Sequence, residues 1–235
     1  MALPKLNTPQ YELELPSTGG KIKFRPFLVK EQKVLMMAQE SKNPVEVQDA
    51  ISKIIYSCTD GLIDAKSSPL FDIEYVFLQL RAKSVGETAE LRVKCPDDEE
   101  TYANVKIKLD DVSVHMTADH TNVVNITDKI KIFMKYPVLN DMKNLGEQSK
   151  EIENVFGLLK TCIHEIHDGD TIYSKVDMTD KELEEFIDSL NTSQFDSLME
   201  FFKTMPKLRH AIAVTNPKTK KRGEVMLEGL DSFLV

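Results

Sequence analysis

The chain has 235 residues, which is enough for one large domain or two small ones with a hydrophobic core. Its formal net charge is −8, which argues against a general nucleic-acid binder because phosphate binding needs a basic surface. The three cysteines are odd in number and far apart, so we predict no disulfide framework and expect a reducing cytosol.

The N-terminal segment reads as a β-hairpin without a targeting signal. The stretch MALPKLNTPQYELEL lacks the basic and apolar regions of a signal peptide, so we expect none. Apolar and charged residues alternate over 11–15 and again over 21–25, and the sequence STGG between them favours a tight turn. Glutamates on the first strand and lysines on the second are expected to pair across the hairpin.

Three helices are predicted next, over 30–41, 45–59 and 68–84. The second has the clearest apolar period of 3.6 residues, and Pro44 suits its first turn. The third contains DIEYVFLQL, a β-branched and aromatic run that is also compatible with a strand. Its spacing of three and four residues between apolar positions favours a helix.

The middle of the chain changes to a β pattern. Residues 87–114 alternate over two runs joined by the polar turn CPDDEE, which predicts a second hairpin. Residues 122–137 predict two further strands. The predicted boundary is the following stretch, NDMKNLGEQSK, within 137–150.

The last part of the chain is predicted to be mainly helical. Helices are expected over 149–167, 179–190 and 192–206, the second starting with a capping box of Thr179 and Glu182. A hairpin over 207–229 follows, with the basic turn NPKTKKRG.

The predicted fold class is α+β, with three parts that stand alone or form one integrated domain. They are an N-terminal β-hairpin with helices (1–86), a central antiparallel β region (87–137), and a helical C-terminal region closed by a β-hairpin (138–235). No apolar run approaches the roughly 20 residues that a membrane span needs.

The stretch CIHEIHDGD is the strongest candidate for chemistry. Zinc proteases carry two histidines four residues apart on a helix, whereas His164 and His167 are three apart. At about 100° per residue, Cys162 lies about 200° from His164 on the predicted helix. A structural role is therefore favoured, and a metal-dependent enzyme using His164 and His167 remains the alternative.

The rest of the sequence provides no catalytic, cofactor-binding or metal-binding motif, so we predict no catalytic, cofactor-binding or metal-ligating residues. Cys95 has no second cysteine or histidine within four residues, so no zinc ribbon is predicted. The sequence contains no GxGxxG, GxxxxGK[ST] or GxSxG motif. The basic turn NPKTKKRG is either a solvated hairpin tip or a contact for an acidic protein partner.

Four stretches together resemble one family. They are MALPKLNTPQYELELPSTGGKIKFRPFLVKEQKVLMMA, FDIEYVFLQLRAKSVGE, FIDSLNTSQFDSLMEFFKTMPKLRHAI and GEVMLEGLDSFL. They are similar to stretches of the baseplate hub proteins of T-even-like contractile-tailed bacteriophages, and the resemblance spans nearly the whole chain.

The resemblance implies a non-enzymatic phage tail protein that acts in the assembly and structure of the baseplate hub. Its implied partners are other hub or tail proteins, with no cofactor, nucleic acid or membrane span, and its oligomeric state is open. The implied location is the host bacterial cytoplasm during assembly and the baseplate of the virion tail. A transient assembly chaperone, absent from the virion, is the alternative.

Three segments are predicted to form the protein interface: RPFLVKEQK, LRAKSVGE and FFKTMPKLRH. Aromatic and arginine side chains are the usual hot-spot types at such surfaces. The predicted apolar anchors are Phe24, Phe27, Phe201 and Phe202, and the predicted polar anchors are Arg25, Arg81 and Arg209.

Overall fold

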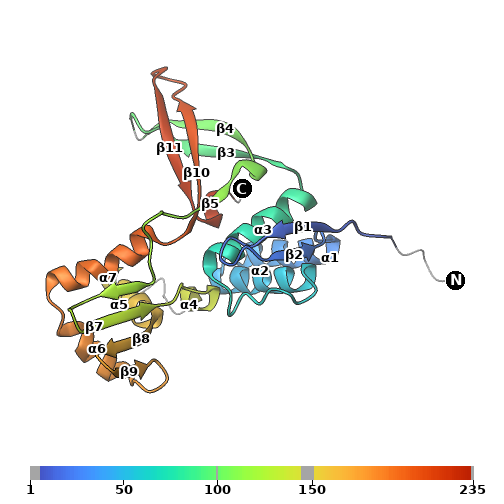
Figure 1. The fold of residues 1–235 in the computed structure, drawn as a ribbon. Coiled ribbons are helices and arrows are strands. Elements are labelled where there is room, and N and C mark those ends of the chain that lie inside the picture. The colour runs from blue at the N-terminus through green and yellow to red at the C-terminus, as the bar shows by residue number, and fades with distance from the viewer. Residues whose placement is uncertain (1–5, 99, 144–150, 234–235) are drawn as a thin grey trace. The chain divides into compact units, whose positions relative to one another are not determined.

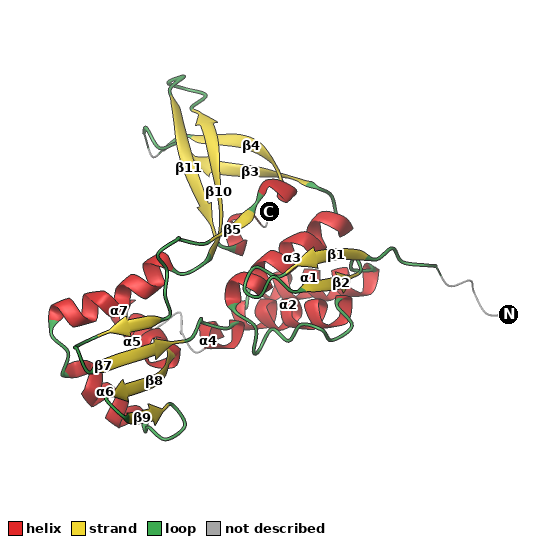
Figure 2. Cartoon of the chain, in the orientation of Figure 1, coloured by secondary structure: helices red, strands yellow, loops and turns green. Residues whose placement is uncertain are grey.

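The computed structural model describes residues 6–98, 100–143 and 151–233. The chain folds into two compact units. Unit 1 combines Met1–His115 with Lys207–Val235, and unit 2 is Met116–Pro206. Figures 1 and 2 show helices and short antiparallel strands in both units, which confirms the α+β class.

The first part of unit 1 is a β-hairpin beside three helices, as predicted. Its elements are β1 (Tyr11–Glu14), β2 (Lys21–Phe24), α1 (Val29–Ser41), α2 (Pro44–Cys58) and α3 (Leu70–Ser84). Lys21 pairs with Glu12 across the hairpin at 3.5 Å, in line with the expected charge pairing. Asn43 caps α2 by accepting a hydrogen bond from the backbone N–H of Val45.

Helix α3 is the central helix of unit 1, and its burial explains why its sequence was ambiguous. Apolar residues are buried on all sides of α3, so the helix lacks a polar face and resembles a buried strand in sequence. Near its start, Asp72 is buried and accepts hydrogen bonds from the backbone N–H and hydroxyl of Ser17. These bonds attach the β1–β2 turn to α3.

The second part of unit 1 consists of two hairpins from distant parts of the sequence. The elements are β3 (Thr88–Lys94), β4 (Tyr102–Lys108), η1 (Leu109–Asp111), β5 (Ser113–His115), β10 (Lys207–Thr215), β11 (Arg222–Glu228) and η2 (Leu230–Phe233). Strand β10 pairs with both β11 and β5, with Leu208 opposite Val114. A Cβ atom at Gly223 would lie 2.5 Å from Pro96 Cγ, so glycine permits the close approach of the hairpins.

Unit 2 is a four-stranded antiparallel sheet with helices packed on one face. The strand order is β6 (Val123–Asn125), β7 (Ile130–Met134), β8 (Ile163–Asp168), β9 (Thr171–Ser174). The helices are α4 (Leu139–Lys143), α5 (Glu151–Cys162), α6 (Asp180–Asp188) and α7 (Thr192–Thr204). One buried cluster joins apolar residues of β6, β7 and β8 to those of α5, α6 and α7.

The helix predicted over 149–167 is wrong in its last five residues. Helix α5 ends at Cys162, and β8 begins at Ile163. Met134 pairs with Ile163 and Phe133 pairs with Glu165, so His164 is an extra residue in a β-bulge. The bulge places Ile163 and Ile166 on the same buried face although they are three residues apart, which is the spacing that a helix would produce.

The unit boundaries differ from the segment boundaries predicted from the sequence, at 86/87 and 137/138. The strands of 87–137 are divided between the two units, and the C-terminal hairpin belongs to unit 1 because β10 pairs with β5. Part of the stretch NDMKNLGEQSK, residues 144–150, lies outside the described residues. Within the described ranges, none of the helices combines the length and apolar character of a membrane span.

Candidate functional site

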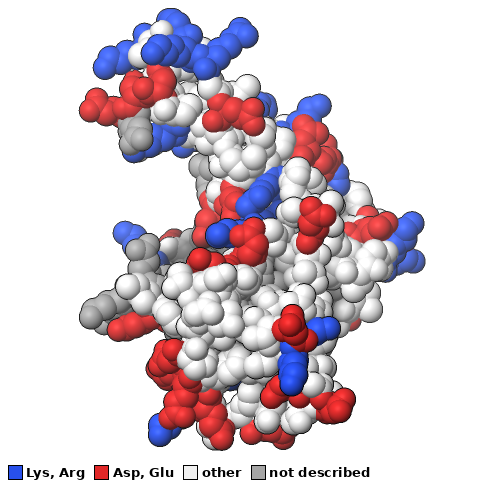
Figure 3. Space-filling model, turned by 60° about the vertical axis from the view of Figure 1, so that its left-hand side comes forward, with Lys and Arg blue, Asp and Glu red and all other residues white. Residues whose placement is uncertain are grey.

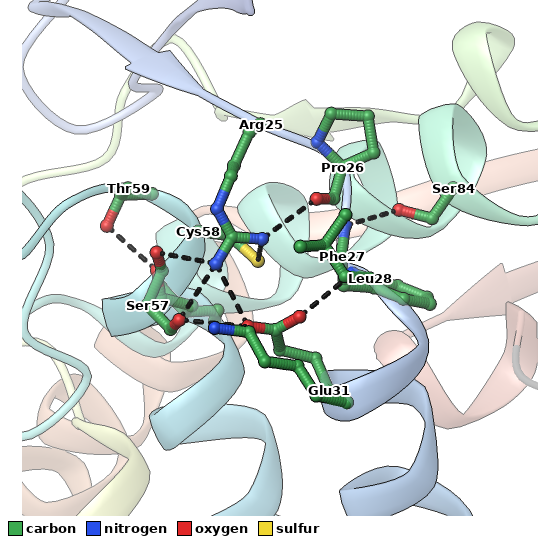
Figure 4. A network of polar contacts seen from close by, with 11 residues as sticks. Arg25, Pro26, Phe27, Leu28, Glu31, Ser57, Cys58, Thr59 and Ser84 are labelled. Carbon is green, nitrogen blue, oxygen red and sulfur yellow. Dashed lines mark hydrogen bonds and ion pairs between the residues drawn. The ribbon is translucent and has the colours of Figure 1, made fainter. Parts of the chain in front are cut away.

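Arg25 of the segment RPFLVKEQK links three elements of unit 1 (Figure 4). Arg25 Nη2 lies 2.9 Å from Glu31 Oε1 and also donates to the backbone oxygen and hydroxyl of Ser57. Arg25 Nη1 donates to the backbone oxygen of Pro26 at 3.1 Å. These bonds join the end of β2 to α1 and to the last turn of α2.

The Arg25–Glu31 pair is largely shielded from solvent, with side-chain exposures of 17% and 6%. Burial raises the pKa of Glu31, but hydrogen bonds from Arg25, the Leu28 N–H and the Ser57 hydroxyl outweigh it and hold the pKa at about 2. Glu31 is therefore ionised at neutral pH, and the pair is an internal connection of unit 1.

The aromatic rings of the same segment are internal as well. Phe24 and Phe27 are buried, so their rings pack in the core of unit 1 and are not exposed for contact. The backbone N–H of Phe27 donates to Ser84 Oγ at 2.9 Å, which brings RPFLVKEQK next to LRAKSVGE. Two of the three predicted interface segments therefore lie side by side.

Exposed apolar residues occur on both of these segments and along α1. Val29 is 80% exposed at the start of α1, and Val85 is 62% exposed after the end of α3. Met36 follows Val29 by seven positions, which is about two helical turns, so both lie on the same outer side of α1. We call this set the α1 surface; its members are Leu28, Val29, Met36, Met37 and Val85.

Sequence reasoning missed the α1 surface. The buried side of α1 carries Glu31 and Ala38, which are the buried residues among those described in the helix, whereas Val34 is exposed. The available signal was the helix spacing of Val29 and Met36, which lie off that side.

The two other predicted arginines differ in their surroundings. Arg81 is partly buried on α3, and its Nη1 atom is buried with no hydrogen-bond partner among the described residues. Burial lowers the pKa of Arg81. Arg209 Nε lies 2.7 Å from Glu228 Oε2, and Lys207 Nζ lies 2.9 Å from Glu228 Oε1, so Arg209 is paired across the β10–β11 hairpin.

An acidic group with a raised pKa connects α3 to the C-terminal segment. Glu74 Oε1 accepts a hydrogen bond from the backbone N–H of Leu230 at 3.2 Å. Burial, followed by the nearby charges of Asp231 and Glu228, raises the pKa of Glu74 to about 7. Glu74 therefore changes its charge near neutral pH in the folded chain.

The stability of unit 1 is expected to fall as the pH rises from about 4.5 to 7, because the raised pKa means that the folded state prefers protonated Glu74. Glu74→Gln keeps the acceptor for Leu230 and removes the charge. We expect Glu74→Gln to raise the free energy of unfolding by about 2 kcal/mol at pH 8 and to change it little at pH 4.5. Urea unfolding at both pH values checks this, and an equal effect at both would contradict it.

Phe201 and Phe202 belong to α7 in unit 2. Phe201 is buried, and its ring centroid lies 5.3 Å from that of His120 and 5.7 Å from that of Tyr136. His120 connects two hydroxyls, with Nε2 3.0 Å from Tyr136 Oη and Nδ1 2.9 Å from Thr204 Oγ1. Phe201 is thus a core residue, whereas Phe202 is partly buried at the edge of this cluster.

The histidines of CIHEIHDGD lie around one carboxylate. Glu165 Oε2 lies 2.9 Å from His167 Nε2, and Glu165 Oε1 lies 3.8 Å from His164 Nε2. Cys162 is buried at the end of α5 in the core cluster, apart from this group. Across the described ranges, no group of three or more His, Cys, Asp and Glu side chains is arranged to hold a metal ion.

The basic turn between β10 and β11 is held in place by the turn between β3 and β4. Asn216 is buried, and its Nδ2 donates to Asp97 Oδ1 at 2.8 Å and to Asp98 Oδ2 at 2.9 Å. Asn216 Oδ1 accepts from the backbone N–H groups of Lys218 and Thr219. Figure 3 shows a group of basic side chains at this hairpin tip, with acidic side chains beneath it. The exposed basic residues of the turn are Lys218, Lys220, Lys221 and Arg222.

Comparisons with known proteins identify the family. A model of the family described as "T4 bacteriophage base plate protein" matches residues 8–235. No curated protein and no solved structure matches the chain significantly. The family match covers both units, including the α1 surface, the Arg25–Glu31 pair and the sheet of unit 2. The chain therefore belongs to the T4 bacteriophage base plate protein family.

Proposed function

We propose that this protein acts in the assembly and structure of the baseplate hub, through contacts with other hub or tail proteins and without catalysing a reaction. Membership of the base plate family supports a structural role in the phage tail. The hub assignment rests on the resemblance of RPFLVKEQK, LRAKSVGE and FFKTMPKLRH to the hub proteins of T-even-like phages.

The observation that carries the proposal is the α1 surface. Val29 and Val85 are more than half exposed, and the hydrogen bond between Phe27 and Ser84 keeps their two segments together. Exposed apolar side chains grouped in this way favour a protein interface. Methionines on the same surface adapt to the shape of a partner.

The chemistry of two buried thiols argues against cysteine-based catalysis at their positions. Burial raises the pKa of Cys58 to about 11 and that of Cys162 to about 12. Both thiols are therefore protonated at neutral pH, whereas a nucleophilic cysteine needs an accessible thiolate. The proposed setting is the host bacterial cytoplasm during assembly, followed by the virion baseplate.

Inactivation of the gene, combined with mass spectrometry of purified virions, tests the proposal. We expect phage without the protein to build incomplete baseplates, as seen by electron microscopy, and wild-type virions to contain the protein at a fixed ratio to other baseplate proteins. Incomplete baseplates together with its absence from wild-type virions would identify a transient chaperone. Normal baseplates without the protein would contradict the proposal.

A further inference from the structure

Strand β9 leaves one edge of the unit 2 sheet open within the described part of the chain. It lies at the end of the strand order and pairs with β8 alone. Lys175 donates its backbone N–H to the His164 oxygen at 2.9 Å, so the antiparallel alternation turns the N–H and C=O of Ile172 away from β8. Open edges of this kind pair readily with another extended chain.

The side chains at this edge are apolar and exposed. Ile172 is 59% exposed and Tyr173 is 47% exposed, and Val176 in the following turn is 89% exposed. Tyr173 pairs with Ile166 of β8 and therefore lies on the same face of the sheet as the core. Ile172 lies on the opposite face, so apolar surface is available on both sides of the edge.

A cavity of about 400 Å³ lies beside β9 on the face that carries Tyr173. It is formed within unit 2 by the sheet, the β9–α6 connection and α6. Its apolar lining residues are Ile130, Ile166, Tyr173, Met178 and Phe186. A strand added at β9 would direct every second side chain to this face, where the cavity can receive it.

The charged residues that line the cavity are all acidic: Asp168, Asp177 and Glu182. The nearest lysines of the β9–α6 region have other partners, because Lys175 pairs with Asp180 and Lys181 pairs with Glu185. The charge of the cavity rim therefore complements lysine and arginine.

We propose that the open edge of β9 and the adjacent acidic-rimmed cavity bind an extended segment of a partner protein in which an apolar residue and a Lys or Arg stand two positions apart. The backbone of the segment pairs with β9, so residues two positions apart both face the cavity. The apolar residue enters the cavity, and the basic residue meets Asp168 or Asp177 at its rim. A bound helix would leave the outward N–H and C=O of Ile172 unpaired, and nucleic acid would be repelled by the acidic rim.

The inference deepens the proposed function by giving the chemistry of one partner segment, and it is tested without phage assembly. Random twelve-residue peptides are displayed and selected on the full-length protein. We expect the selected peptides to carry an apolar residue and a basic residue two positions apart. Their affinity is expected to fall at least tenfold for Asp168→Lys/Asp177→Lys. The matched control, Asp128→Lys/Asp196→Lys, makes the same charge change at exposed positions of unit 2 and is expected to leave the affinity unchanged.

A second variant tests the strand pairing itself. Ile172→Pro removes the outward N–H donor of β9, and we expect it to reduce peptide affinity at least tenfold while urea unfolding shows that unit 2 remains folded. Three results would overturn the inference: no enriched peptides, enriched peptides without basic residues, or equal binding to the wild type and Asp168→Lys/Asp177→Lys. Concentration-dependent dimers that dissociate in that variant would instead assign the edge to a second copy of this chain.

Failure of the inference and failure of the proposed function give different results. Phage that build normal baseplates without the protein would remove the hub function and leave the peptide result unchanged. Absence of peptide binding together with incomplete baseplates would retain the hub function and remove the role of β9.

Discussion

Arg25→Met is expected to lower the free energy of unfolding of unit 1 by about 3 kcal/mol, because it leaves the buried carboxylate of Glu31 with only the exposed Lys30, at 3.3 Å, as a charged partner. Ser57 Oγ and the Leu28 N–H still donate to Glu31, but neither carries a charge. Urea unfolding followed by circular dichroism measures the change. A loss below about 1 kcal/mol would contradict an internal role for the pair.

The double variant Arg25→Met/Glu31→Gln is the control for this prediction. It removes both charges, so we expect it to be more stable than Arg25→Met alone. The pH dependence provides a second check. Because the folded pKa of Glu31 is lowered to about 2, its contribution is present above about 4.5 and is lost as the pH falls towards 2. Arg25→Met should weaken this acid dependence.

Phe201→Ala is expected to lower the free energy of unfolding of unit 2 by about 3–5 kcal/mol, because it removes a buried ring from the cluster with His120 and Tyr136. Phe202→Ala is the matched control on the same helix. It should cost less, because the Phe202 ring is only partly buried. Both are measured by urea unfolding.

The Phe201 result separates a core role from an interface role. A core residue lowers stability when it is truncated, with or without a partner. If Phe201→Ala retained wild-type stability and still failed to support baseplate assembly, Phe201 would be an interface anchor as the sequence predicts. A loss of stability in unit 2 with unchanged unfolding of unit 1 would agree with the observed burial and with the two compact units.

Elements defined by local sequence were predicted well. The β1–β2 hairpin follows from alternation around STGG, and α6 follows from its capping box, in which Thr179 Oγ1 accepts from the Glu182 N–H and Glu182 accepts from the Thr179 N–H. The α3 helix was identified from its apolar spacing despite its β-branched and aromatic residues. Local patterns are sufficient where neighbouring residues determine the element.

Features that depend on distant residues were missed. The β-bulge at His164 reproduces helical spacing in a strand, and only the pairing of β8 with β7 and β9 distinguishes the two. The pairing of Leu208 with Val114 places the C-terminal hairpin in unit 1, and no local pattern contains that information. Pairings between strands that are far apart in the sequence could therefore not be predicted from local patterns.

The interface over RPFLVKEQK, LRAKSVGE and FFKTMPKLRH stays a prediction, and the structure locates its segments and side chains. RPFLVKEQK and LRAKSVGE do meet at the hydrogen bond between Phe27 and Ser84. Residue type did not identify which side chains are exposed. Aromatic residues are common in both cores and interfaces, so composition alone does not distinguish a core residue from an interface residue. Phe24 and Phe27 are buried, while the exposed neighbours Val29 and Val85 were not chosen.

Complementation of a phage that lacks this gene tests the central claim, that the protein works through exposed contacts in the baseplate. The test variant is Val29→Ser/Val85→Ser. Its matched control is Leu62→Ser/Met226→Ser, which changes residues of unit 1 that are 62% and 55% exposed outside the α1 surface. We predict that the control restores complete tails and that the test variant, at equal stability and expression, yields at least tenfold fewer. Equal yields of complete tails from both variants would contradict the account.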